Sequence, residues 1–128
     1  MFPYVLVAIG GAIGSMLRYG GGVFVGHLWR DAFPLGTLLI NIVGSCLMGL
    51  FVGLMARLLP DWQNEARLFF AVGVLGGFTT FSSFSLDAIS MLERGSVGPA
   101  ALYVLVSVAG GLFALWFALL VMRMGVSP

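Results

Sequence analysis

Four long apolar stretches constrain the fold of this chain more than any other feature of its sequence. They cover residues 3–28, 35–59, 68–91 and 97–122, and each is long enough to cross about 30 Å of hydrocarbon as a helix. Only 9% of the 128 residues are charged, against about 25% in soluble proteins. A soluble domain of this size cannot bury so much apolar surface, and disorder requires the opposite composition. We therefore expect one domain over residues 1–128, an all-α membrane protein with four transmembrane helices in a lipid bilayer.

The arginines are divided almost evenly between the two ends of the predicted bundle. Short links separate the stretches, so neighbouring helices should be antiparallel and both termini should lie on one side. The two sets of arginines are then Arg57, Arg67 and Arg123 on the side of the termini, and Arg30 and Arg94 on the other. The charge bias that normally fixes orientation is almost absent, which favours a dual-topology, antiparallel homodimer. The alternative is that an insertion factor or Arg18 imposes a single orientation.

Several of the 19 glycines are spaced four residues apart within the apolar stretches. Such pairs let helix backbones approach closely in lipid. The pairs are Gly10 with Gly14, Gly22 with Gly26, and Gly49 with Gly53. They favour either tight packing between two copies of the chain or ordinary helix packing within one copy.

The third stretch contains residues that are typical of a helix end. Gly76 and Gly77 weaken a helix, and five hydroxyl residues follow within the seven positions from Thr79 to Ser85. Because such side chains favour helix caps, we expect the third helix to break in mid-membrane near the glycines and restart with a Thr or Ser as its N-cap. The freed carbonyl oxygens would suit an alkali cation such as Na⁺. The alternative is an intact helix whose hydroxyls bond to carbonyls one turn back.

Aromatic and hydroxyl side chains alternate after the expected break. Phe81 and Phe84 share a face at helical spacing, and their neighbours Thr80, Ser82 and Ser83 should not face lipid. A phenyl ring has a positive edge that can stabilise an anion without carrying charge. Hydroxyls and ring edges along one path favour a weak anion route with several sites, which is what conduction requires.

Isolated polar residues in two other stretches are candidates for the same route. Asn41 shares a helix face with Thr37 and Ser45. Its position alone favours equally a helix–helix hydrogen bond and a binding site. Tyr103 and Ser107 form an i, i+4 pair on the fourth predicted helix and would extend the polar path.

Two charged residues are expected within or close to the spans, where charge is costly and usually functional. Arg18 would lie near an interface, extend its side chain toward water and attract anions into a vestibule. Asp87 is either functional or paired with an Arg near the membrane surface.

Three segments together resemble the Fluc (CrcB) family of fluoride channels. They are Gly-Gly-Phe-Thr-Thr-Phe-Ser-Ser-Phe-Ser at residues 76–85, Gly-Thr-Leu-Leu-Ile-Asn at residues 36–41, and Gly-Gly-Ala-Ile-Gly-Ser-Met-Leu-Arg-Tyr at residues 10–19. The match extends over all four spans. The resemblance implies an antiparallel, dual-topology homodimer with two fluoride pores.

The same resemblance implies roles for individual residues. A structural Na⁺ at the dimer centre would be held by the main-chain carbonyls of Gly76 and Thr79. Asn41 would line the pore, and Phe81 and Phe84 would present their ring edges to fluoride. The ion at the dimer centre would be static and not transported with fluoride.

The resemblance implies a passive, fluoride-selective channel, a multi-pass protein of a bacterial inner membrane that exports fluoride from the cytoplasm and protects against its toxicity. The alternative is a four-helix exporter of the small multidrug resistance type. Its proton coupling requires a carboxylate in the first span, but this chain has no Asp or Glu before Asp31, and Asp87 is the only candidate. A membrane scaffold without transport would leave the polar break unexplained. The sequence contains no nucleophile–base pair, phosphate loop or basic run, so we expect neither an enzyme nor a nucleic-acid partner.

Overall fold

The computed structural model describes residues 2–58 and 60–124, and within them four helical spans are long and apolar enough to cross a membrane. The spans are α1 (Phe2–Leu28), α2 (Leu35–Leu58), a third span (Gln63–Glu93) and α6 (Val97–Met124). The predicted all-α fold with four spans is confirmed. Residue 59, the predicted end of the second span, lies outside the described part, as do residues 1 and 125–128.

The third span is divided into four consecutive segments. They are α3 (Gln63–Ala66), η1 (Arg67–Leu75), α4 (Gly76–Phe78) and α5 (Phe81–Glu93). The η1 segment is a π-helix with wide turns, in which hydrogen bonds join residues five apart. At its end the Gly76 N–H donates to the carbonyl of Ala71. The only interruption in this span falls between α4 and α5.

The third span begins earlier than its apolar pattern predicts. The second and third apolar stretches leave residues 60–67 as a link, but Gln63–Ala66 is helical. Gln and Glu are good helix formers, and Glu65 in the first turn carries the negative charge that the amino end of a helix favours. Hydropathy therefore marks the apolar part of this helix and misses its polar first turn.

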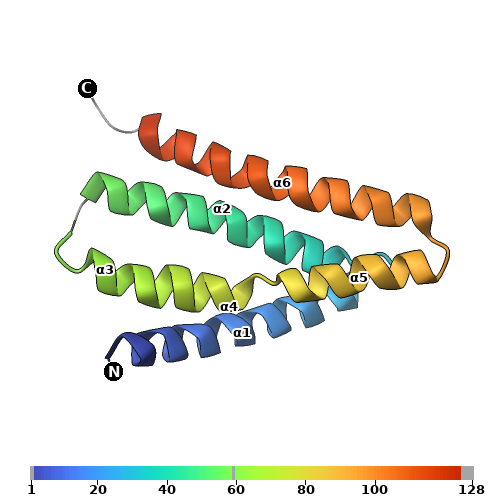
Figure 1. The fold of residues 1–128 in the computed structure, drawn as a ribbon, viewed down its shortest axis with the longest axis horizontal. Helices are drawn as coiled ribbons and strands as arrows, with labels where there is room; N and C mark the ends of the chain where they lie inside the picture. Colours follow the sequence, from blue (N-terminus) through green and yellow to red (C-terminus); the bar gives the residue numbers. More distant parts are fainter. Residues whose placement is uncertain (1, 59, 125–128) are drawn as a thin grey trace.

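Consecutive spans run antiparallel, as the short links predict (Figure 1). In this view α2 lies between α6 and the third span, and α1 lies on the far side of the third span. Along its first half, the third span packs against α1, while α6 packs against both α2 and α5. The start of α1 and the end of α6 lie at the same end of the bundle, as expected from four antiparallel spans (Figure 1).

Two of the three glycine pairs bring helices together within the chain. A side chain at Gly14 would collide with the backbone of η1, and one at Gly49 would lie 2.6 Å from the carbonyl oxygen of Leu115. The contacts of α1 with η1 and of α2 with α6 are therefore backbone to backbone, as small residues allow. A side chain added at Gly22 or Gly26 would meet no atom within 4 Å in the single chain, so this third pair does not bring helices into close contact there.

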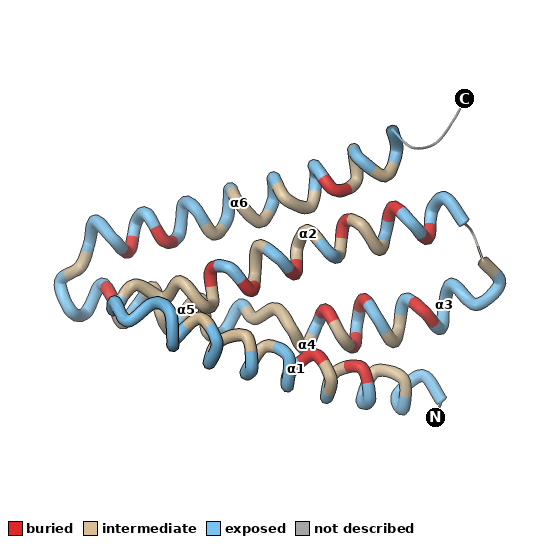
Figure 2. Tube along the Cα trace, turned by 180° about the vertical axis from the view of Figure 1, so that it is seen from behind, coloured by how far each residue is buried: buried red, intermediate tan, exposed pale blue. Residues whose placement is uncertain are grey.

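Buried residues lie along the lines where the helices meet, and most of each helix surface is exposed or half-buried (Figure 2). In α6 only Ala100, Tyr103 and Ala118 are buried. Leu38 and Met91 join Ala100 and Tyr103 in a core cluster that links α2, α5 and α6. The outer faces are largely apolar as well, which is typical of helices surrounded by lipid or by another subunit.

Candidate functional site

The third span breaks at Thr79 and Thr80, which confirms the predicted interruption. Both residues have extended backbone, with φ/ψ of −86°/156° and −150°/120°. The Thr80 hydroxyl oxygen accepts a 3.1 Å hydrogen bond from the Ser83 N–H and so caps α5, as the hydroxyl cluster predicts. The glycines themselves, Gly76 and Gly77, remain helical in α4. The break therefore falls just after them, where a hydroxyl residue supplies the cap.

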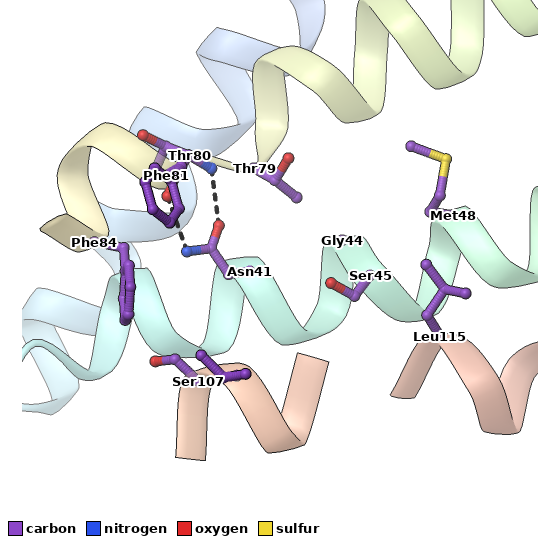
Figure 3. Close-up of a pocket in the computed structure, with 11 residues that line it drawn as sticks. Asn41, Gly44, Ser45, Met48, Thr79, Thr80, Phe81, Phe84, Ser107 and Leu115 are labelled. Atoms are coloured by element: carbon purple, nitrogen blue, oxygen red, sulfur yellow. Dashed lines mark hydrogen bonds between the residues drawn. The ribbon is translucent and has the colours of Figure 1, made fainter. Parts of the chain in front are cut away.

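Asn41 on α2 holds this break through both polar atoms of its amide (Figure 3). Its Oδ1 accepts from the Thr80 N–H at 2.8 Å, and its Nδ2 donates to the Thr80 carbonyl at 3.0 Å. In a continuous helix the Thr80 N–H would donate to the Gly76 carbonyl, so Asn41 replaces that bond and releases the Gly76 oxygen. An amide nitrogen carries two hydrogens, so one of them remains beyond the bond to Thr80.

A cavity of about 350 Å³, here called the central cavity, lies beside the break and between α2, α5 and α6 (Figure 3). The hydroxyl oxygen of Ser107 is buried there and has no hydrogen-bond partner within residues 2–58 and 60–124. This hydroxyl and the remaining N–H of Asn41 can each donate a hydrogen bond to a small acceptor. Six of the predicted site residues line the cavity: Asn41, Thr79, Thr80, Phe81, Phe84 and Ser107.

A second cavity of about 390 Å³, here called the outer cavity, shares Thr80 with the central cavity. It brings together Arg18, Thr37 and Ser83, and Asp87 also lines it. Thr37 and Asn41 share a helix face, as predicted, but they line different cavities because Thr80 lies between the two spaces. Three further predicted residues, Gly76, Ser82 and Tyr103, line neither cavity.

Arg18 on α1 reaches the break in the third span. Its Nε donates a 3.0 Å hydrogen bond to the Gly77 carbonyl. That Arg18 also lies near an interface and attracts anions into a vestibule stays a prediction. The break frees carbonyls at the end of α4, and such orphan acceptors attract a cationic donor.

Three aromatic rings run in series from the central cavity into the protein core. The ring centroids are 5.7 Å apart for Phe81 and Phe84, and 5.2 Å apart for Phe84 and Tyr103. Phe81 and Phe84 thus lie on one face, as their spacing predicts. Phe81 is 79% exposed on the single chain, whereas Tyr103 is fully buried.

Comparison with known proteins identifies the family. The family model described as "CrcB-like protein, Camphor Resistance (CrcB)" matches residues 5–119. The chain belongs to the CrcB family. The resemblance found in the sequence is thereby confirmed over most of the chain.

Three relatives of this CrcB chain carry the name fluoride-specific ion channel FluC. They come from Agrobacterium fabrum, Rhizobium johnstonii and Thermus thermophilus, and are 54%, 49% and 51% identical to this chain. The matches cover 93%, 96% and 88% of this chain and 94%, 98% and 89% of the relatives. These relatives are named as ion channels and not as enzymes, in agreement with the expectation that the chain is not an enzyme.

Tyr103 and Asp87 form a pair that sequence reasoning missed in this CrcB chain. The Tyr103 hydroxyl donates a 3.0 Å hydrogen bond to Asp87 Oδ2. The alternative that Asp87 pairs with an Arg near the membrane surface is therefore wrong, since its partner is a buried phenol. The two residues lie on different helices and are 16 positions apart, so no local spacing could have signalled the contact.

Removing the Asn41 amide should destabilise the break. Asn41→Ala leaves the Thr80 N–H and carbonyl without these partners, and an unsatisfied polar group costs about 1–3 kcal/mol. We expect a loss of this size in the free energy of unfolding, measured by titrating SDS into the detergent-solubilised protein. Ser45→Ala, in the same cavity wall, is the matched control and should change stability by less than about 0.5 kcal/mol. Equal stability of the two variants would contradict the role given to Asn41.

Proposed function

We propose that this CrcB protein is a passive fluoride channel. The observation that carries the proposal is the central cavity, where donors from Asn41 and Ser107 meet the rings of Phe81 and Phe84 beside a break in a membrane span. Fluoride is a small, strongly hydrated anion, so a selective path must replace its water with short hydrogen bonds. The relatives named fluoride-specific ion channels support the same substrate.

The proposed route begins at the outer cavity and continues through the central cavity. Arg18 gives the outer cavity a positive charge, and Thr37 and Ser83 add hydroxyls to its wall. Thr80 connects it to the central cavity, and the Ser82 hydroxyl lies 3.2 Å from that of Thr80. Tyr103 does not line the route but packs against Phe84 and so helps to hold that ring in place.

A passive mechanism fits these residues better than exchange with protons. The first span has no carboxylate, since no Asp or Glu precedes Asp31, and Asp87 is engaged by Tyr103. An exporter of the small multidrug resistance type is therefore not favoured. Hydrogen fluoride would enter a bacterium by diffusion and dissociate in the cytoplasm, and the channel would let fluoride leave through the inner membrane. Such export would protect the cell from fluoride.

The ring edges of Phe81 and Phe84 should be required for flux. Phe81→Ile or Phe84→Ile keeps an apolar side chain but removes the positive edge. Ring contacts contribute about 0.5–1.5 kcal/mol. The upper end of that range corresponds to about a tenfold change in affinity. We expect fluoride efflux from liposomes to fall by about this factor.

Phe78→Ile is the control for this experiment. Phe78 lines neither cavity and packs instead at Gly44, so its replacement should cost stability more than flux. Size-exclusion profiles should show that each variant is assembled. If the Phe81 and Phe84 variants conduct as fast as the wild type, the rings only fill space and the proposed pore is misplaced.

We further propose that the functional unit is an antiparallel, dual-topology homodimer. The near-even division of the arginines favours insertion in both orientations. Phe81 lines the central cavity but is 79% exposed on the single chain, so the cavity is open on that side. A second copy would cover it, together with the open face of α1 at Gly22 and Gly26.

An unbiased topology should be sensitive to added charge. Lys residues added to the link at residues 94–96 should bias insertion to one orientation and lower fluoride efflux when that variant is expressed alone. The same number of added Gln residues should leave both unchanged. Labelling of a terminal tag from each side of the membrane measures orientation. A tag found on one side in every wild-type molecule would show that the orientation is fixed.

We also propose that the dimer centre holds a structural Na⁺ through the main-chain carbonyls of Gly76 and Thr79. The residues fit such an ion because Asn41 takes the Thr80 N–H away from the Gly76 carbonyl, and Thr79 leaves helical geometry. Carbonyl oxygens are hard ligands that suit an alkali cation. Two carbonyls from each chain would form a shared site, which favours a fixed ion over a transported one.

Sodium should therefore stabilise the assembled protein. An ion that binds only the folded state raises the melting temperature in a saturable way. We expect this rise when Na⁺ replaces N-methylglucamine at constant ionic strength, and a smaller rise with K⁺. Fluoride efflux should not carry Na⁺ with it. Strictly stoichiometric movement of Na⁺ with fluoride would contradict a structural role.

A further inference from the structure

Figure 1 shows the end of the bundle where α5 is connected to α6. A third cavity lies there. Its volume is about 520 Å³, and it forms where the link between α1 and α2 meets the end of α5 and the start of α6. It shares no lining residue with the central or the outer cavity. This end cavity is therefore separate from the proposed fluoride route.

The walls of the end cavity combine apolar side chains with two opposite charges. Asp31 and Arg94 supply the charges, and both are exposed residues of the links. Within residues 2–58 and 60–124, neither has an ion-pair partner. The main apolar side chains of the wall are Trp29, Phe33, Leu35, Met91 and Leu102.

The end cavity lies at the level expected for lipid headgroups. Trp29 follows the last residue of α1, and its indole N–H donates a 3.0 Å hydrogen bond to the Phe33 carbonyl. Tryptophans at the ends of transmembrane helices mark the boundary between acyl chains and headgroups. Leu102 in α6 is 55% exposed, so this wall faces outward, where acyl chains lie. An occupant would thus meet charge at the links and apolar surface along α6.

We propose that the end cavity binds a phospholipid with a primary-amine headgroup, of the phosphatidylethanolamine type. The Arg94 guanidinium would bind the phosphate, and the Asp31 carboxylate would accept hydrogen bonds from the ammonium. One acyl chain would lie along Phe33 and Leu102. The quaternary ammonium of phosphatidylcholine has no N–H to donate, and the headgroup of phosphatidylglycerol offers no cation to Asp31.

Native mass spectrometry of the full-length protein tests this preference. The protein in detergent is mixed with equal amounts of phosphatidylethanolamine, phosphatidylcholine and phosphatidylglycerol that carry the same acyl chains. We expect phosphatidylethanolamine to be bound over phosphatidylcholine by about two- to fivefold, as an exposed ion pair allows. Asp31→Asn should abolish this ratio by lowering phosphatidylethanolamine binding alone. Arg94→Gln should lower the binding of all three lipids, because all three carry the phosphate.

Asp61→Asn and Arg123→Gln are the matched controls, because they make the same charge changes at the opposite end of the bundle. Both should keep the wild-type lipid ratio, and melting temperatures should show that all four variants are folded. A ratio that survives Asp31→Asn, or that falls equally in the controls, overturns the proposal. The proposal is also overturned if Asp31→Asn changes only the dissociation of the dimer and not lipid binding, because the cavity would then contact a second copy of the chain.

Discussion

A break within a transmembrane helix is tolerable only if its backbone polar groups find partners inside the protein. In this chain the Asn41 amide takes both the N–H and the carbonyl of Thr80, and Arg18 takes the carbonyl of Gly77. The Thr80 hydroxyl then caps the restarted helix at Ser83. Since Asn41 and Arg18 come from α2 and α1, the break fixes the position of the third span relative to both helices, and with it the two cavities beside the break.

Close packing is what brings those partners within reach of the break. Gly44 follows Asn41 by three residues on α2. A side chain at Gly44 would collide with the Thr79 side chain. A side chain at Gly77 would lie 2.7 Å from the Gly11 carbonyl oxygen. Glycine at these two positions therefore lets α2 and α1 approach the third span at the level of the break. The short Asn41 side chain can then hydrogen-bond to the main chain directly.

The proposed pore relies on neutral donors and keeps formal charge out of its central cavity. Asn41, Ser107 and Thr80 contribute dipoles there, while Arg18 and Asp87 line the outer cavity. Neutral donors hold an anion less strongly than a fixed cation does, and conduction requires sites that an ion can leave. The charges that remain are engaged by the protein itself, Arg18 by a carbonyl and Asp87 by a phenol. This division is consistent with passive movement of an anion.

The sequence by itself determined the four spans, the break with its hydroxyl cap, and the common face of Phe81 and Phe84. These features follow from hydropathy, backbone preference and helical period, which act between neighbours in the chain. Only the tertiary structure decided that Arg18 binds Gly77, that Asp87 pairs with Tyr103, and that Thr37 is separated from the central cavity. Those contacts join residues on different helices or depend on what lies between them. They are set by how closely the helices approach and how each is rotated about its axis, which no local pattern specifies.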